Sequence, residues 1–206
     1  MKRSLMILLL LIATQCTLMA QQSEVQIRQK INEVASSLKT LQCDFVQTKH
    51  LKMLNDDMVS KGKMYYQQND LLRWEYISPY TYTFIINHDK VLLKNSKRND
   101  VIDVKQNKLF KEIARIMMNS VIGNCLNEEK DFRSNISISK GEWVVSLLPQ
   151  RKNIKQIFQR IVLHFSSKQP IVKQVELVEK NGDKTIIDLK NVRTNEAIST
   201  NMFTIR

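Results

Sequence analysis

The stretch that decides the fold runs from Gly62 to Ile86, GKMYYQQNDLLRWEYISPYTYTFII. Successive side chains of a strand point to opposite faces, and here one parity is almost entirely apolar. These residues are Met64, Tyr66, Leu72, Trp74, Tyr76, Tyr80, Tyr82, Phe84 and Ile86. The other parity carries Lys63, Arg73, Glu75, Thr81 and Thr83. The contrast predicts an antiparallel sheet with one dry face and one wet face, and a face this aromatic needs a large cover.

Two segments with helical periodicity supply candidates for that cover. From Ser23 to Leu41 the apolar residues recur every three or four positions in one stripe: Ile27, Ile31, Val34, Leu38 and Leu41. From Lys108 to Ile122 the apolar surface is unusually broad: Leu109, Phe110, Ile113, Ala114, Ile116, Met117 and Val121. We expect both segments to be amphipathic helices that lie on the sheet.

Most of the remaining chain has the alternation of strands. Strands are expected near residues 43–52, 58–67, 90–95, 135–139, 142–148, 160–165, 171–180 and 184–193, and Asn201 to Ile205 is strand-like. Lys140-Gly141 and Asn181-Gly182 are compact turns between such runs, and Pro149 to Ile157 is a basic loop or short helical turn. This order predicts an α+β, mainly β fold: a strongly curved antiparallel sheet with helices packed on its concave side.

The first twenty residues have the features of a secretory signal peptide. Met1 to Arg3 is basic, Leu5 to Ala13 is almost wholly apolar, and Ala20 is small. The apolar run is shorter than the roughly 20 residues that span a bilayer. We therefore expect cleavage after Ala20 and export of residues 21–206 as a single domain.

A lipidated Cys16 is the alternative interpretation of the same segment. A lipoprotein signal places a small residue just before its cysteine, whereas this sequence has Gln15 there. The chain is strongly basic, with 32 Lys and Arg against 20 Asp and Glu. Anionic lipid headgroups, an acidic protein partner and simple solubility all remain open, while export argues against nucleic acid.

The sequence contains no recognisable catalytic or metal-binding pattern. His50, His88 and His164 have no partner at metal-ligand spacing, and the four glycines form no phosphate loop. Cys43 and Cys125 are open to two interpretations, a disulfide or two separate buried thiols. A cysteine nucleophile with a distant histidine also stays open. We expect a binding protein without catalytic residues, metal or cofactor.

The segment around the aromatic run resembles the LolA/LolB family of lipoprotein carriers. The resemblance rests on an ordered set of residues: Phe45-Val46-Gln47, Gly62 to Tyr66, Arg73-Trp74-Glu75-Tyr76, Pro79 and Asn87 to Lys90. It is sharp from about Leu41 to Leu93 and follows the element order of most of the mature chain. The resemblance implies an unclosed β-barrel in which helices form a lid over an apolar cavity.

Membership of that family would also imply a function. Such a protein is a periplasmic chaperone, here expected as a monomer, that shelters the acyl chains of lipoproteins in its cavity. It takes them from an inner-membrane ABC transporter to an outer-membrane acceptor. The residues expected to line the cavity are Met64, Tyr66, Leu72, Trp74, Tyr76, Tyr82, Phe84, Ile86, Phe110, Ile113 and Met117.

One segment departs from the family pattern. The turn from Gln67 to Asp70 lacks the basic residue and the proline that often precede the tryptophan strand, and that basic residue is associated with lid opening. Two alternative functions on the same scaffold stay open: a carrier of another envelope lipid or glycolipid, and a lipid-sensing regulatory protein. By parity, Arg73 is expected to form an ion pair on the exterior.

Overall fold

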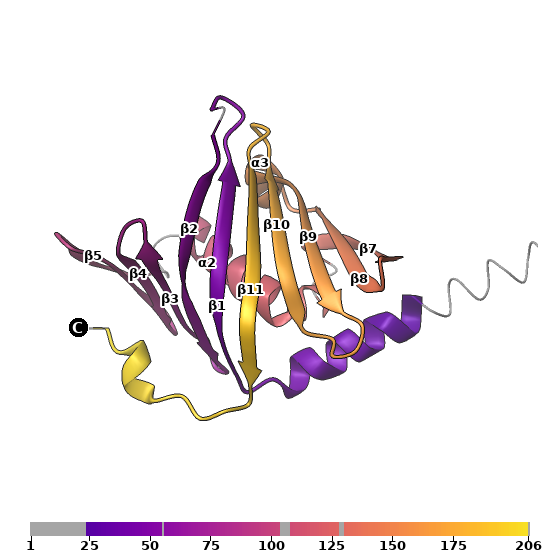
Figure 1. Cartoon of the computed structure of the whole chain (residues 1–206), viewed down its shortest axis with the longest axis horizontal. Coiled ribbons are helices and arrows are strands. Elements are labelled where there is room, and N and C mark those ends of the chain that lie inside the picture. The colour runs from indigo at the N-terminus through magenta and orange to yellow at the C-terminus, as the bar shows by residue number, and fades with distance from the viewer. Residues whose placement is uncertain (1–23, 55, 104–107, 128–129, 206) are drawn as a thin grey trace, which may run out of the picture.

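The structure is a computed structural model that describes residues 24–54, 56–103, 108–127 and 130–205, with the backbone alone over 108–114. The expected signal peptide lies outside the described residues. Eleven strands form one antiparallel sheet, in the order β6-β5-β4-β3-β2-β1-β11-β10-β9-β8-β7 (Figure 1). Because β6 and β7 are separate edges, the curved sheet is an unclosed barrel, as predicted.

The bounds of the strands agree closely with the alternation in the sequence. They are β1 Thr40–His50, β2 Met58–Gln67, β3 Leu71–Ser78, β4 Tyr82–Asn87, β5 Lys90–Asn95, β6 Asn99–Asp103, β7 Phe132–Ser139, β8 Glu142–Pro149, β9 Phe158–Ser166, β10 Val172–Glu179 and β11 Lys184–Thr194. The edge strand β6 was not predicted, because four of its five residues are exposed and leave no alternation to detect. At the centre of the sheet, β1 pairs with β11, so that Phe45 lies opposite Leu189.

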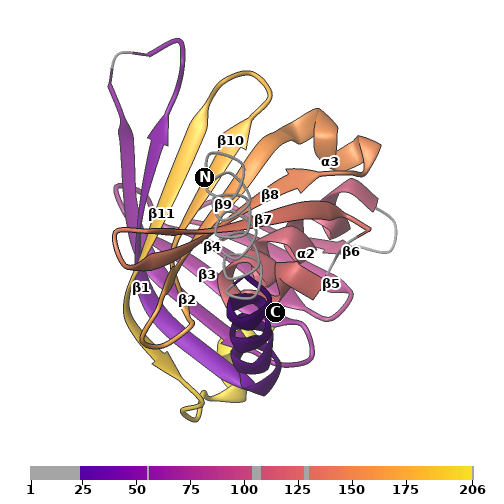
Figure 2. The ribbon, with the colours of Figure 1, turned by 90° about the vertical axis from the view of Figure 1, so that its right-hand side faces the viewer.

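Helices cover the concave face of the sheet, also as predicted. They are a helix over residues 24–37, α2 (Lys108–Ile122), the 3₁₀ turn η1 (Asn124–Asn127) and α3 (Lys152–Ile157). Figures 1 and 2 show α2 inside the curve of the sheet and the N-terminal helix across its lower end. Ile31, Met118, Val121 and Ile154 contribute buried side chains from these helices to the same core as the sheet.

The first helix ends earlier than its apolar stripe suggested. It stops at residue 37, and Leu41 already belongs to β1. Leu41 is fully buried in the strand, so one buried residue satisfies both the helical and the strand period. The chain is held at this junction by the C-terminal region: the backbone N–H of Lys39 donates to Asn195 Oδ1 at 2.7 Å, and that of Asn195 to the Thr40 carbonyl at 2.9 Å.

The strand predicted over Asn201 to Ile205 is wrong. The segment instead forms a 3₁₀ turn, η2 (Thr200–Phe203), on the outer face of the sheet, with Phe203 buried against Ile85 and Leu92. The consecutive residues Met202 and Phe203 both pack against the sheet, which the alternation of a strand would prevent. Asn87 Nδ2 donates to the Phe203 carbonyl at 3.0 Å.

Gly62 allows a close approach inside the sheet. A Cβ atom at this position would lie 1.9 Å from the Glu75 carbonyl oxygen and 2.6 Å from Cζ of Phe45. The Phe45 ring therefore rests directly on the backbone of β2. The pairing of β2 with β3 is irregular at the same place, between Lys61 and Gly62. A side chain here would have to displace both a ring and a backbone strand.

We predict that Gly62→Ala lowers the free energy of unfolding by about 3 kcal/mol or more, because the new methyl group cannot be accommodated without moving backbone. Urea unfolding followed by circular dichroism measures the change. Lys61→Ala, at an exposed neighbouring position, is the matched control and should change stability by less than about 0.5 kcal/mol. Equal midpoints for the two variants would contradict the close approach.

A second prediction concerns the C-terminal segment. Phe203→Ala removes a ring that is only 1% exposed and should cost about 3 kcal/mol of stability. The same unfolding measurement tests it, with Val25→Ala as a control at a side chain that is 61% exposed. A Phe203 variant as stable as the control would show that η2 does not stabilise the outer face.

Candidate functional site

The structure brings the predicted sheet residues together on one concave surface. Register places them in rows across β2, β3 and β4: Met64 opposite Trp74 opposite Phe84, and Tyr66 opposite Leu72 opposite Ile86. All six are buried in one core cluster, and Tyr76, Tyr82 and Met117 are half-buried against it. The side chains of Phe110 and Ile113 lie outside what the structure describes. That these residues bind lipid stays a prediction.

Phe45 of β1 belongs to the same surface and was missing from the predicted set. Its ring centroid lies 4.5 Å from that of Trp74 and 5.2 Å from that of Tyr76, edge-on to the latter. Such aromatic pairs stabilise a packed face beyond the area they bury. The signal was present in the sequence, because Leu41, Cys43 and Phe45 share one parity.

The solvent exposure of the aromatic side chains increases along β3. Trp74 is 1% exposed, Tyr76 and Tyr82 are half-buried, and Tyr80, just beyond the end of β3, is 49% exposed. Burial raises the pKa of Tyr76 to about 12, and its hydroxyl donates to Gln47 Oε1 at 3.0 Å. Burial also raises the pKa of Tyr82. The phenols are therefore neutral, and they mark the end at which the concave face meets solvent, which we call the tyrosine end.

Trp74 carries an unused hydrogen-bond donor into this surface. Its Nε1 is buried and forms no hydrogen bond, although the indole lies close enough to Tyr76 to offset part of the rise in the phenol's pKa. A buried donor without an acceptor costs about 1 to 3 kcal/mol. The aromatic surface is thus apolar except for the Trp74 N–H, which could donate a hydrogen bond to an acceptor on a bound molecule.

A buried carboxylate ties the helices to the sheet. Asp131, which precedes β7 and is 7% exposed, lies 2.5 Å from Arg115 Nη2 of α2 and 3.3 Å from Nη1 of Arg151, just before α3. The Gln150 backbone N–H donates to the Asp131 carbonyl at 2.7 Å. We call Arg115, Asp131 and Arg151 the arginine clamp. It depends on contacts between distant segments, so sequence periodicity could not reveal it.

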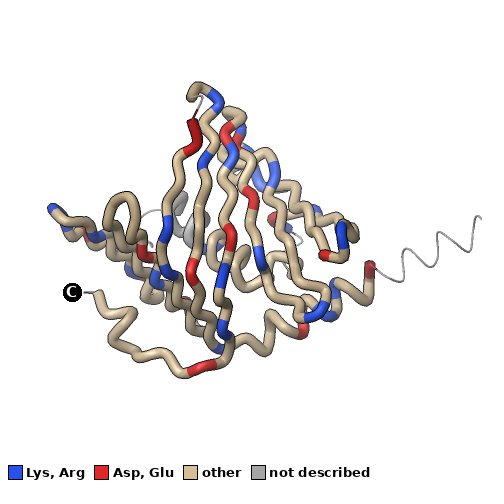
Figure 3. The backbone as a smooth tube through the Cα atoms, in the orientation of Figure 1, with Lys and Arg blue, Asp and Glu red and all other residues tan. Residues whose placement is uncertain are grey.

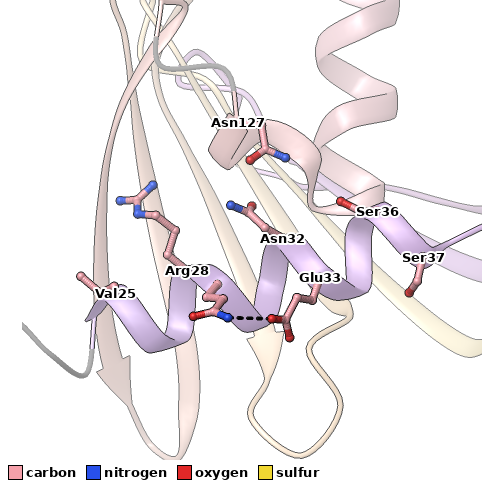
Figure 4. Close-up of a pocket in the computed structure, with 8 residues that line it drawn as sticks. Val25, Arg28, Asn32, Glu33, Ser36, Ser37 and Asn127 are labelled. Carbon is pink, nitrogen blue, oxygen red and sulfur yellow. Dashed lines mark hydrogen bonds between the residues drawn. The ribbon is translucent and has the colours of Figure 1, made fainter.

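A groove of about 750 Å³ lies along the N-terminal helix, away from the aromatic surface (Figure 4). Apart from Val25, the residues that line it have polar or charged side chains: Val25, Arg28, Gln29, Asn32, Glu33, Ser36, Ser37 and Asn127. Gln29 Nε2 donates to Glu33 Oε1 at 2.8 Å. The aromatic surface, in contrast, is filled by its own side chains and by the helices.

Both described cysteines are buried, and two of the three histidines contact carboxylates. Cys43 and Cys125 are both buried and are not bonded to each other, so the interpretation as two separate buried thiols is confirmed. Burial, with a contribution from Asp44, raises the pKa of Cys43 to about 12, which suppresses the thiolate. His50 contacts Asp57, and His164 lies 3.2 Å from Glu176. Among the described residues, no three His, Cys, Asp or Glu side chains are placed to hold a metal.

Lys and Arg are intermixed with Asp and Glu along the strands and in the loops (Figure 3). Arg73 Nε is 3.1 Å from Glu75 Oε2, and Arg73 Nη1 also donates to the Met202 carbonyl at 3.4 Å. The predicted exterior ion pair is therefore confirmed. Within the described ranges, no helix has both the length and the apolarity to cross a membrane.

Comparisons with solved structures show the same fold in proteins of very different sequence. MucB in its complex with MucA from Pseudomonas aeruginosa has a TM-score of 0.53 at 9% identity, over 87% of this chain and 60% of that one. An uncharacterised conserved protein from Thermus thermophilus has a TM-score of 0.52 at 10% identity, over 87% and 92%. A DUF1329 family protein from Desulfovibrio piger has a TM-score of 0.50 at 11% identity, over 89% and 96%.

No curated protein matches the chain. A family model described as outer membrane lipoprotein carrier protein LolA matches residues 36–206, which include every strand of the sheet and the helices α2 and α3. The chain therefore belongs to the LolA family of outer membrane lipoprotein carrier proteins.

Proposed function

We propose that this protein is a periplasmic chaperone that shelters the acyl chains of lipoproteins against the aromatic surface of β1 to β4. The observation that carries the proposal is that surface itself: Phe45, Met64, Trp74 and Phe84 form a continuous apolar wall, and it shares one core with side chains of the covering helices. Membership of the LolA family supports the cargo class.

The size of the hydrophobic effect explains why such a carrier is needed. Each methylene removed from water is worth about 0.8 kcal/mol, so covering ten of them offsets roughly 8 kcal/mol of exposure. A rigid open pocket would therefore hold a long acyl chain too tightly for delivery. The protein avoids this because its own helices fill the surface when cargo is absent, and cargo must compete with them.

The Trp74 N–H could add a hydrogen bond to the apolar contacts with which cargo competes against the helices. In the closed structure it is unsatisfied. The ester and amide carbonyls of an acylated cysteine are acceptors, and one of them reaching Trp74 would recover part of the cost of burying the donor. The cargo would then be held by apolar contact along its chains and oriented by a single hydrogen bond near its head.

The proposed function also includes a route by which the cargo is loaded and delivered. A cleaved signal over residues 1–20 would place the domain in the periplasm, where an inner-membrane ABC transporter would load it and an outer-membrane acceptor would unload it. The protein would act as a monomer. Because the chain lacks a basic residue between Gln67 and Asp70, the arginine clamp is the feature that would hold the lid helix α2 in place of such a residue.

A second candidate uses the scaffold to bind a protein. The MucB structure of the same fold was solved with MucA bound, and MucB is longer than the region that aligns with this chain. A regulatory protein of that kind would co-purify with a protein partner that lacks acyl groups. A carrier of another envelope lipid would instead co-purify with free lipid.

Native purification tests the proposed function. Mass spectrometry of the protein isolated from its own periplasm should find acylated lipoproteins, and the pure protein should release lipoproteins from spheroplasts. The double variant Tyr82→Ser with Met117→Ser should reduce the amount released at least about tenfold, because two apolar contacts are lost at half-buried positions that folding tolerates.

Ile77→Ser is the matched control for that variant. Ile77 is also on β3 but is 51% exposed and of the opposite parity to Tyr76, so its release activity should equal that of the unmodified protein. Release that is unchanged in the double variant, or lost equally in the control, would argue against the aromatic surface as the cargo site.

The clamp gives a separate prediction. Asp131→Asn leaves two arginines without their buried carboxylate and should lower the free energy of unfolding by about 3 kcal/mol. Hydrogen exchange with peptide-level mass spectrometry should show faster exchange across α2, while β1 and β11 keep their protection. Exchange that rises uniformly over the sheet would show a general loss of stability and not a specific release of the lid.

A further inference from the structure

The hairpin between β1 and β2 exposes large apolar side chains at its end. Met53 is 95% exposed, Leu54 56%, Met58 50% and Val59 48%. We call these four residues the apolar tip. Isolated exposed apolar residues are ordinary, but four of them gathered at the end of one hairpin suggest an interaction site.

The apolar tip projects beyond the body of the sheet. Pairing of β2 with β3 begins only at Lys61, opposite Ser78, so Met58 and Val59 are paired with β1 alone. Figure 1 shows this hairpin rising above its neighbours beside the turn between β10 and β11. The Lys52 backbone N–H donates to Asp183 Oδ1 at 3.0 Å, which braces the hairpin against that turn.

Lysines and carboxylates both surround the apolar tip: Asp56 and Asp57 lie between Leu54 and Met58, and Asp183 lies on the neighbouring turn. Lys52 and Lys61 flank it on its own hairpin, and Lys180 lies on the neighbouring turn. The Lys180 N–H donates to the Ile157 carbonyl at 3.0 Å, which brings α3, with Lys152 and Lys155, to the same end. All five lysines are exposed, and none forms an ion pair with another described residue. These five lysines outnumber the three carboxylates Asp56, Asp57 and Asp183, and the excess of positive charge favours a negatively charged surface.

The apolar tip is at the same end of the molecule as the tyrosine end of the aromatic surface. Lys61 of β2 lies opposite Ser78, and Tyr76 of β3 lies opposite Tyr82 of β4. The tip therefore continues β2 past the level at which Tyr76, Tyr80 and Tyr82 meet solvent. A surface that received the tip would face the opening of the concave side.

We propose that the apolar tip inserts into the surface of a bilayer that contains anionic lipids, with the lysines on the headgroups. A protein partner is less suited to this patch, because a stable interface covers about 800 Å² on each side and four side chains on a narrow hairpin offer far less. Unbranched methionines at a protruding point fit the irregular boundary between headgroups and acyl chains. This docking is a property of the tip alone and does not rest on the identity of the cargo.

Vesicle flotation with the full mature chain tests the inference. The probes are vesicles of equal parts phosphatidylcholine and phosphatidylglycerol, and vesicles of phosphatidylcholine alone. We expect binding to the first and about tenfold weaker binding to the second, with loss of that difference at high salt because exposed charges are screened. Met53→Ser with Leu54→Ser should weaken binding to the anionic vesicles about tenfold or more.

Controls separate insertion from attraction of a basic protein to any anionic surface. Ile138→Ser with Val101→Ser removes two apolar side chains of similar exposure, 61% and 54%, from other parts of the sheet and should leave binding unchanged. A fluorescent label on Met53→Cys should shift to the blue on vesicles, while the same label on Ile138→Cys should not.

Three results would overturn the inference. They are no flotation with anionic vesicles, equal binding by the tip variant and the unmodified protein, or a label at position 53 that stays in water. Retained lipoprotein release together with lost vesicle binding in the tip variant would support docking as a step separate from cargo shelter.

Discussion

The contact between the Phe45 ring and the bare backbone at Gly62 is the constraint on which the concave face depends. With any side chain at position 62, the ring would be lifted from β2. Its stacking against Trp74 and Tyr76 would then be lost. These three rings span β1 and β3 and are continuous with Met64 and Phe84. The absence of a side chain at Gly62 therefore allows the rings of β1 and β3 to pack into one continuous apolar surface.

Under the proposed function, two competing partners would use that surface. In the closed structure the helices bury it, and the arginine clamp holds α2 in a defined place. An acyl chain would offer the same kind of contact as the helices, so its binding free energy would be the difference between two similar contributions. A carrier built in this way can bind strongly apolar cargo and still give it up.

Much of this arrangement could be predicted from sequence, because it follows from local periodicity. The parity of Met64, Trp74 and Phe84 identified the inner face, and the turn residues located the hairpins. Leu41 misled the prediction of the first helix, since it suits both a helical and a strand period. The edge strand β6 escaped because it buries almost nothing.

Contacts between segments that are far apart in the sequence could not be predicted from local periodicity. Nothing near Asp131 indicates that arginines from α2 and from the start of α3 converge on it. Likewise, nothing near Phe203 reveals that Ile85 and Leu92 expose an apolar patch on the outer face. For the candidate site, parity supplied the strand residues, while the helical contribution from Phe110 and Ile113 stays a prediction. The apolar character of Met53 and Leu54 was readable, but their exposure at a projecting end was not.

The pairing of β1 with β11 limits the order in which the strands can pair during synthesis. The centre of the sheet joins residues 40–50 to residues 184–194, so the first strand made by the ribosome must wait for the last before its second edge is filled. Long-range pairing of this kind makes folding slow. The central pairing of the sheet can therefore form only after nearly all of the chain has emerged from the ribosome.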